Sequence, residues 1–324
     1  MTLSAFIHAW ADHPSAFIAC LGLLGLIFGS FVNVVIWRWP AMMERAWWQD
    51  TSSQLADAES FSRTFGAPAP DSLAQAHHAL EDRLRILKPF DLARPGSHCP
   101  ACEQPLRWWH NVPLVSWVML RGRCAACDAP ISWQYPVVEL GCAALFATLG
   151  WRLGPAATTV LWCAWAATLV AAAVIDWRTT LLPDALTLPL MWGGLIAAVL
   201  GWTLPPATAL LGASVGYLVL WGVHRAFLMV TGREGMGRGD FKLLAALGAW
   251  LGWQPLLPLL LWASVAGSLV GWLLQRTGRL QGAAYVPFGP FLAGSALAVL
   301  LIGPEQALES VLWLGAWVNS ALSG

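Results

Sequence analysis

Two aspartates, Asp176 and Asp240, lie where long uncharged segments meet short polar connections. The second closes a glycine-rich run, Gly-Met-Gly-Arg-Gly-Asp, at residues 235–240. An ionisable group at membrane depth is costly to bury, so each carboxylate is a functional candidate by default. If both reach the same edge of a bilayer, the pair predicts the chemistry of an aspartyl protease.

Two neighbouring carboxylates in a partly dehydrated site cannot both ionise cheaply, so one keeps a proton and the pair titrates as a unit. The charged member can deprotonate a water, while its protonated partner hydrogen-bonds a scissile carbonyl. Gly235, Gly237 and Gly239 lack a Cβ, which allows left-handed backbone and close approach of a peptide. Taken alone, an Asp at a helix end is more often a cap, and a glycine-rich run is more often a flexible connection.

The composition excludes a water-soluble domain, because 57% of the 324 residues are hydrophobic and only 11% are charged. Uncharged runs cover residues 13–37, 153–175, 185–224, 243–275 and 280–304. About 20 residues cross the hydrocarbon core, so the two longest runs each fold back once. With a further span at 136–151, we predict an all-α polytopic membrane protein with about eight transmembrane helices. The sixth, near 241–252, is short and needs shielding by protein or a thinned bilayer.

The basic residues predict the orientation of these helices. No Lys or Arg precedes Arg38, so the first apolar stretch is expected to remain as a transmembrane helix. If Arg38 faces the cytoplasm, eight crossings place 17 of the 18 basic residues on that side and only Arg152 outside. Both termini are then periplasmic, and both aspartates lie at the cytoplasmic face.

The connection between the first two helices contains two Cys-x-x-Cys pairs separated by 21 residues, formed by Cys99, Cys102, Cys124 and Cys127. This spacing predicts a tetrahedral zinc site that is structural, because four thiolates leave no open position. Disulfides are less expected on a reducing side of the membrane. His98 and His110 are possible substitute ligands.

We therefore expect four regions. Residues 1–38 form the first transmembrane helix, 39–134 a cytoplasmic loop domain with the two knuckles, and 135–304 a seven-helix membrane catalytic domain. Residues 305–324 form an interfacial tail, since a ninth span would have no basic residue to hold its end.

Six segments together resemble the type IV prepilin peptidases. These enzymes are GxGD aspartyl proteases and are also called leader peptidase/N-methyltransferases. They are residues 29–38, 111–117, 135–140, 175–184, 234–242 and 287–290. The resemblance runs from about residue 17 to residue 303. Residues 177–179, Trp-Arg-Thr, depart from a family segment that is commonly more acidic or contains histidine. We expect this difference to alter local electrostatics without removing activity.

The resemblance implies that Asp176 and Asp240 are catalytic and that the glycine run is their active-site loop. It implies cleavage of the leader of type IV prepilins or type II secretion pseudopilins after a glycine, at the bacterial inner membrane. It further implies methylation of the new N-terminus with S-adenosylmethionine, with Gly122 at a position associated with methyl transfer. Partners would be these substrates and membrane lipid, with no nucleic acid.

Two alternatives remain open from the sequence. A relative with the same glycine-aspartate chemistry could cleave without methylating, although the presence of both cysteine pairs favours the longer, bifunctional form. A metal-binding membrane transporter would use the aspartates to line an ion path. Against that alternative, both acids are expected at one face and none marks the middle of the bilayer.

Overall fold

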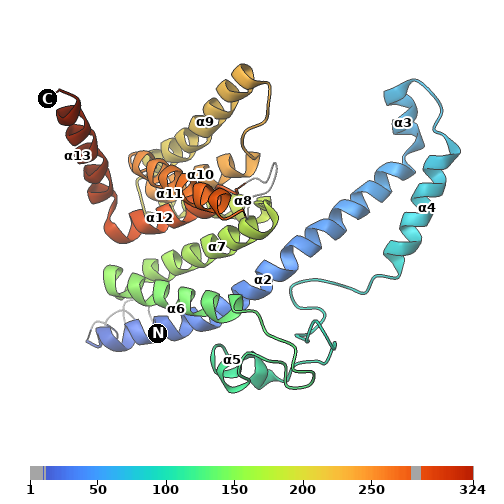
Figure 1. The fold of residues 1–324 in the computed structure, drawn as a ribbon, viewed down its shortest axis with the longest axis horizontal. Coiled ribbons are helices and arrows are strands. Elements are labelled where there is room, and N and C mark those ends of the chain that lie inside the picture. The colour runs from blue at the N-terminus through green and yellow to red at the C-terminus, as the bar shows by residue number, and fades with distance from the viewer. Residues whose placement is uncertain (1–9, 11, 279–285, 324) are drawn as a thin grey trace. The chain divides into compact units, whose positions relative to one another are not determined.

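The structure, a computed structural model, describes residue 10, residues 12–278 and residues 286–323 (Figure 1). These residues form helices and connections, with no β-strand among them, which confirms the predicted all-α class. The chain divides into two compact units: a membrane unit, Met1–Asn33 with Trp133–Gly324, and a loop unit, Val34–Ser132.

The membrane unit contains the first part of α2 (Pro14–Ala56), then α6 (Gln134–Leu153), α7 (Ala157–Thr179), α8 (Asp184–Val199), α9 (Pro206–Thr231), α10 (Arg238–Leu251), α11 (Leu256–Arg276), α12 (Gly289–Ile302) and α13 (Pro304–Ser323). Among the described residues, α2, α6, α7, α9 and α11 are long and apolar enough to cross a membrane. The pair α12 and α13, bent by 106°, gives a sixth if it is taken as one span. The predicted helical membrane protein is confirmed.

Each of the eight predicted segments contains a helix, but α8, α10 and α12 are shorter than a full crossing. They have 16, 14 and 14 residues. At ~1.5 Å per residue they reach about 21–24 Å, less than the ~30 Å hydrocarbon core. The predicted eighth segment began at residue 280, whereas α12 begins at Gly289; residues 279–285 lie outside the described residues.

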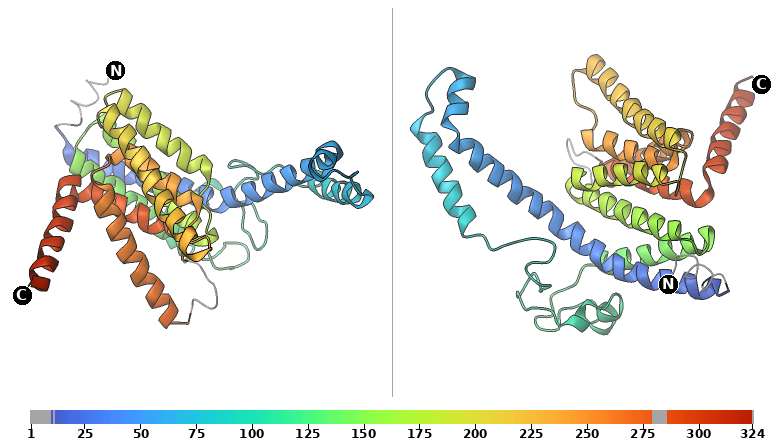
Figure 2. Two further views of the ribbon diagram at one scale, coloured as in Figure 1. Left: turned by 90° about the horizontal axis from the view of Figure 1, so that it is seen from above. Right: turned by 180° about the vertical axis from the view of Figure 1, so that it is seen from behind.

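The short helix α10 lies among α8, α9 and α12 (Figure 2). Every side chain from Asp240 to Leu251 is buried except that of Lys242, which is half-buried. Of the two ways to accommodate this short segment, the structure shows shielding by protein. Because protein surrounds its backbone and side chains, α10 can be too short to span lipid and still be stable.

Small residues let α9 and α10 approach closely. Gly212 and Gly216 form a Gly-x-x-x-Gly pair on α9, and Gly248 faces them from α10. A Cβ on Gly212 would collide with the Gly248 carbonyl oxygen, and one on Gly216 would lie 2.5 Å from the Leu244 carbonyl oxygen. In membranes, such contacts replace the hydrophobic driving force that bundles use in water.

A second Gly-x-x-x-Gly pair joins α2 to α6. A Cβ on Gly25 would lie 2.6 Å from the Ala143 Cα, and one on Gly29 would lie 2.7 Å from the Glu139 Cα. Asn33, buried at the end of this interface, donates from Nδ2 to the Tyr135 carbonyl oxygen at 3.1 Å. Gln134 in turn donates from Nε2 to the Asn33 Oδ1 at 3.5 Å. The first helix is therefore held against α6 by close backbone packing and by polar contacts of Asn33.

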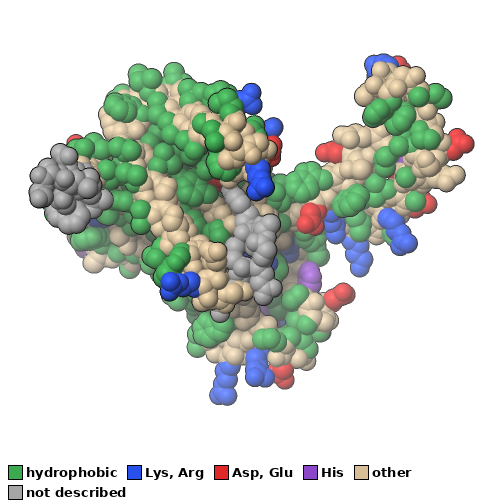
Figure 3. All heavy atoms as spheres, turned by 45° about the horizontal axis from the view of Figure 1, so that its top comes forward, with side chains coloured by type: hydrophobic (Ala, Val, Ile, Leu, Met, Phe, Trp, Pro, Cys, Tyr) green, Lys and Arg blue, Asp and Glu red, His purple; other side chains and the backbone are tan. Residues whose placement is uncertain are grey.

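Hydrophobic side chains cover much of the face of the membrane unit that is seen in Figure 3. Exposed side chains include Leu210, Val265 and Trp192. A large continuous apolar surface is unusual in water-soluble monomers and is expected where lipid replaces water.

The loop unit consists of the second part of α2, then α3 (Ala58–Phe65), α4 (Asp71–Arg85), the 3₁₀ turn η1 (Trp108–Asn111) and α5 (Val115–Met119). Glu81 and Arg85 form an ion pair on α4 at 2.8 Å. Arg38 donates to the Pro95 carbonyl oxygen at 2.6 Å, and Arg45 donates to the Lys88 carbonyl oxygen at 2.9 Å. These bonds attach the chain that follows α4 to α2.

Substituting Gly212 by Val is expected to destabilise the membrane unit, because the added atoms would meet the Gly248 carbonyl. Overpacking a core costs about 1–3 kcal/mol or more. Gly222→Val is the matched control, since a Cβ at Gly222, on the same helix, meets nothing within 4 Å. Thermal stability in detergent, followed by size-exclusion chromatography after heating, should fall for Gly212→Val alone. Equal loss in both variants would contradict the close α9–α10 packing.

Candidate active site and metal centre

Asp176 lies in the last turn of α7 and is 4% exposed. Its Oδ2 accepts a hydrogen bond from the backbone N–H of Gly289 at 3.0 Å, and this bond is buried. Gly289 is the first residue of α12, so the end of one helix meets the beginning of another at this carboxylate. The end of α7 also agrees with the predicted position of Asp176 at the end of the third apolar segment.

Asp240 lies in the first turn of α10 and is also 4% exposed. Gly239, which precedes it, packs against Leu182, and Leu182 also lies beside Gly289, the residue bonded to Asp176. The Asp240 Oδ1 is buried without a hydrogen-bond partner among the described residues. The structure thus brings together the two aspartates that the sequence singled out, and it leaves one buried oxygen for a further group.

Leu182 occupies the space beside the two carboxylates. A Cβ on Gly239, next to Asp240, would lie 2.7 Å from the Leu182 Cβ. A Cβ on Gly289 would lie 2.5 Å from the Asp176 Oδ2 and 3.0 Å from the Leu182 Cδ1. Neither Leu182 nor Gly289 was a predicted site residue, although both lie in segments that carried the family resemblance.

The sequence predicted that the three glycines before Asp240 allow left-handed backbone, and the structure does not show this conformation at any of them. None of them has a positive φ. Gly235 is close to a side chain, since a Cβ there would lie 2.6 Å from the Phe227 ring, and Gly239 is close to Leu182. A Cβ on Gly237 would make an ordinary contact, 3.7 Å from the Asp240 Oδ2. Close approach therefore explains Gly235 and Gly239.

Two charged side chains near the site contact other residues. Lys242 forms an ion pair with Asp184 at 2.7 Å, which connects α10 to the first residue of α8. Arg178 donates to the Gln134 Oε1 at 3.3 Å. The ion pair is partly exposed and contributes little stability by itself. It holds the Lys242 ammonium group on Asp184 rather than on Asp176 or Asp240.

The four cysteine Sγ atoms lie within 4.8 Å of one another, so the loop unit brings the two predicted pairs together. The Cys99 and Cys127 sulfurs are 3.8 Å apart. A tetrahedral zinc with bonds of ~2.3 Å requires about 3.8 Å between sulfurs. The donor set and its spacing therefore fit zinc. Four cysteines complete this group without His98 or His110, the substitute ligands that the sequence left open.

The two knuckles share one backbone pattern. Glu103 N–H bonds the Cys99 carbonyl oxygen, and Asp128 N–H bonds the Cys124 carbonyl oxygen, at 2.9 and 3.0 Å. Glu103 and Asp128 both have positive φ. Backbone N–H groups of Cys102 and Ala101 lower the pKa of the Cys99 thiol to about 6, which favours the thiolate that a metal requires.

Gly122 lies just before the second knuckle, with φ +69°. A Cβ there would lie 2.9 Å from the Trp117 Cζ2, and its carbonyl oxygen accepts the Ile131 N–H at 2.7 Å. The left-handed backbone and the indole both favour glycine at this position. The Trp117 indole is the nearest side chain to this glycine.

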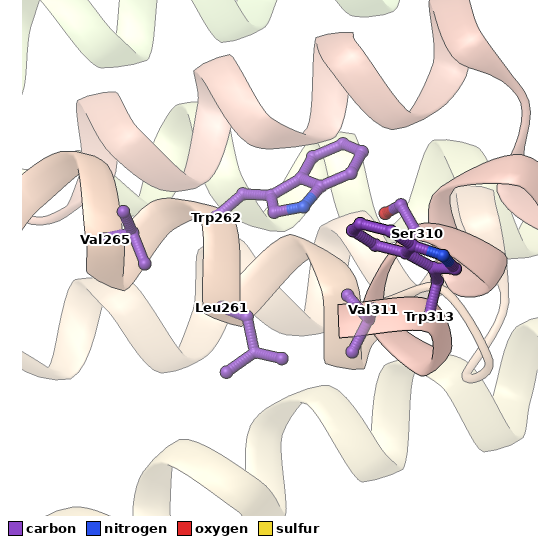
Figure 4. A pocket seen from close by; sticks show the side chains of 6 residues that line it. All are labelled: Leu261, Trp262, Val265, Ser310, Val311 and Trp313. Atoms are coloured by element: carbon purple, nitrogen blue, oxygen red, sulfur yellow. The ribbon is translucent and has the colours of Figure 1, made fainter. Parts of the chain in front are cut away.

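An apolar cleft of about 430 Å³ lies between α11 and α13 (Figure 4). It is lined by Leu261, Trp262, Val265, Ser310, Val311 and Trp313. This lining includes none of the predicted site residues and no acid or base. The cleft is therefore not a candidate for the predicted proteolysis.

Two family models match the chain. The model of the bacterial peptidase A24 N-terminal domain matches residues 23–153, and that of the type IV leader peptidase family matches residues 163–272. The first match contains all four cysteines, and the second contains both aspartates. No solved structure matches the chain.

Relatives named prepilin leader peptidase/N-methyltransferase align over most of both chains. One from Dickeya chrysanthemi is 44% identical, with 93% of this chain and 97% of the relative covered. One from Stutzerimonas stutzeri is 42% identical, covering 91% and 94%. One from Pseudomonas putida is 41% identical, covering 97% and 100%.

Cys102→Ser and Cys127→Ser are each expected to lower the zinc content of the purified protein, because three thiolates bind the ion less tightly than four. Cys20→Ser is the control, since Cys20 lies on α2 in the membrane unit, outside the cluster. Inductively coupled plasma mass spectrometry should find about one zinc per wild-type and control chain. Unchanged zinc content in both knuckle variants would rule out this centre.

Proposed function

We propose, since this chain belongs to the type IV leader peptidase family, that Asp176 and Asp240 are the catalytic pair of a prepilin peptidase. The enzyme cleaves the leader of type IV prepilins or type II secretion pseudopilins at the bacterial inner membrane and then methylates the new N-terminus. The observation that carries the catalytic assignment is the convergence of two aspartates, each 4% exposed, at the ends of α7 and α10.

The pair performs general acid–base catalysis. Because burial disfavours two adjacent charges, the two carboxylates hold one proton between them. The ionised carboxylate removes a proton from water as the water attacks the scissile carbonyl, and the protonated carboxylic acid hydrogen-bonds the carbonyl oxygen. The unpartnered Asp240 Oδ1 supports this assignment, since a substrate group can complete its hydrogen bonding.

The membrane setting fits the substrate. A prepilin has a cationic leader followed directly by an apolar helix, so its cleavage point lies at the cytoplasmic boundary. With 17 of the 18 basic residues on the cytoplasmic side and both termini periplasmic, the two aspartates lie at that boundary. The substrate helix then stays in lipid, and only an extended stretch beside Gly239 enters the site.

The loop unit carries the methyl-transfer half of the function, with S-adenosylmethionine as the methyl donor that the relatives' name implies. Bound S-adenosylmethionine supplies an electrophilic methyl group. The protein must hold the neutral N-terminal amine in line with that methyl, which is mainly a positioning problem. Zinc at the four cysteines stabilises the loop unit. Gly122 shapes the backbone that precedes the second knuckle.

Asp176→Asn and Asp240→Asn are each expected to abolish leader cleavage, because an amide can neither accept the proton from water nor share one with its partner. Cys99→Ser is expected chiefly to lower methylation. The purified protein is incubated with a prepilin and S-adenosylmethionine, and product masses are read. Cleavage by either Asn variant would refute the proposed pair. Cleaved but unmethylated product from the wild type would identify a peptidase that does not methylate.

Gly239→Ala is expected to lower the cleavage rate by ~100-fold, because its Cβ would push Leu182 and displace Asp240, and misplacement by about 1 Å can cost this much. Gly237→Ala is the matched control, because its Cβ would have room. The double variant Gly239→Ala/Leu182→Ala should recover part of the rate. If Gly237→Ala were as inactive as Gly239→Ala, the glycines at 235–239 would be needed for backbone flexibility rather than for close packing against Leu182.

A further inference from the structure

The beginning of α12 is directed at Asp176. Gly289 donates its backbone N–H to the Asp176 Oδ2 at 3.0 Å in a buried hydrogen bond between residues 113 positions apart. The approach leaves no space for a side chain, since a Cβ on Gly289 would lie 2.5 Å from the same oxygen. Glycine is therefore the residue that lets this N–H reach the carboxylate.

A helix N-terminus favours negative charge, because its first N–H groups lack partners within the helix and carry a partial positive charge. A hydrogen bond from an N–H to a carboxylate favours the ionised form over the protonated one. Helix α12 has no charged side chain, so its effect on Asp176 comes from the backbone.

Asp240 lies in an equally buried but differently bonded position. As a residue of the first turn of α10, it is also near a helix N-terminus. However, its Oδ1 is buried without a hydrogen-bond partner among the described residues. Both side chains are 4% exposed, so the buried bond from Gly289 is the main difference between them.

We infer that Gly289 is a positioning residue that sets the roles of the pair, with Asp176 as the ionised general base and Asp240 as the protonated general acid. The inference rests on the proposed function and goes further, because acid–base symmetry alone would allow either assignment. The unpartnered Oδ1 of Asp240 is then free to carry the proton that the scissile carbonyl oxygen receives.

The reaction balances with these roles. Asp176 takes one proton from water as the water oxygen bonds the carbonyl carbon, and Asp240 gives its proton to the carbonyl oxygen, which forms a geminal diol. As the C–N bond breaks, Asp176 gives its proton to the departing nitrogen. Asp240 takes a proton back from one diol hydroxyl as the new carboxyl group forms. Both side chains return to their starting states.

Further titratable groups lie on α7 itself and on the helices that pack against it. Asp240 faces Asp176 from α10. Asp184, on α8, is paired with Lys242. Glu139 is buried on α6, which also carries Arg152. Arg178, on α7 itself, donates to Gln134. The test therefore has to identify which aspartate titrates, in addition to measuring a pH profile.

Covalent labelling identifies the ionised member directly. An ionised carboxylate opens a small neutral epoxide to give an ester, whereas a carboxylic acid reacts poorly. The full-length enzyme in lipid nanodiscs is treated with an aryl glycidyl ether at neutral pH, and the esterified peptide is found by tandem mass spectrometry. We expect label on Asp176, retained in Asp240→Asn. Equal or preferential labelling of Asp240 in the wild type would overturn the inference.

The variant Gly289→Ala tests the contribution of the N–H bond. Without this bond Asp176 is protonated more easily, so the acid limb of kcat/KM should move to higher pH by about one unit, the size expected for one charge-assisted bond. Gly294→Ala on the same helix is the control, because a Cβ there meets nothing within 4 Å. A purely structural role would lower the rate at every pH without moving the limb, and that result would contradict the inference.

The two hypotheses fail in different ways. Cleavage by Asp176→Asn or Asp240→Asn would remove the catalytic pair itself. Loss of cleavage in both, together with label on Asp240 or an unmoved acid limb in Gly289→Ala, would keep the pair and reject the assigned roles. If Gly289→Ala does not fold, the labelling of the wild type still decides.

Discussion

Burying two carboxylates side by side is the constraint on which this membrane unit depends. A buried charge is stable only with compensating partners, and the nearby Lys242 is paired with Asp184. The compensation at Asp176 comes from a backbone N–H at a helix N-terminus. A backbone donor cannot neutralise the pair as a salt bridge would. The pair can therefore keep one exchangeable proton, which acid–base chemistry at a peptide bond requires.

Helix packing through small residues makes this arrangement possible. Gly212 and Gly248 bring α9 against α10, and Gly289 brings α12 against Asp176. Because α10 is enclosed by neighbouring helices, it can be shorter than a full membrane crossing. The same closeness makes the site sensitive to a single added methyl group, since a packed interior has little free volume to absorb it.

The loop unit is stabilised in a different way. Its helices α3 and α4 bury no residue, so they contribute little core. Two knuckles with the same backbone turns bring four sulfurs together, and a metal ion there would supply folding free energy that the apolar contacts do not. The two family models match the chain in succession, the first over residues 23–153, which include the loop unit, and the second over residues 163–272, which include both aspartates.

The sequence by itself determined the membrane class, the positions of the helices, the cysteine quartet and the two aspartates. Composition, apolar runs and short-range spacing all report local properties, and these features depend on them. Only the tertiary structure decided that α10 is enclosed, that Gly235 and Gly239 are needed for close contact rather than left-handed backbone, and that Gly289 binds Asp176. Contacts between residues 113 positions apart leave no periodic signal in the chain. Such contacts are set by how the helices pack. The donor here is a backbone N–H, which almost every residue type has, so the residue type alone does not reveal it.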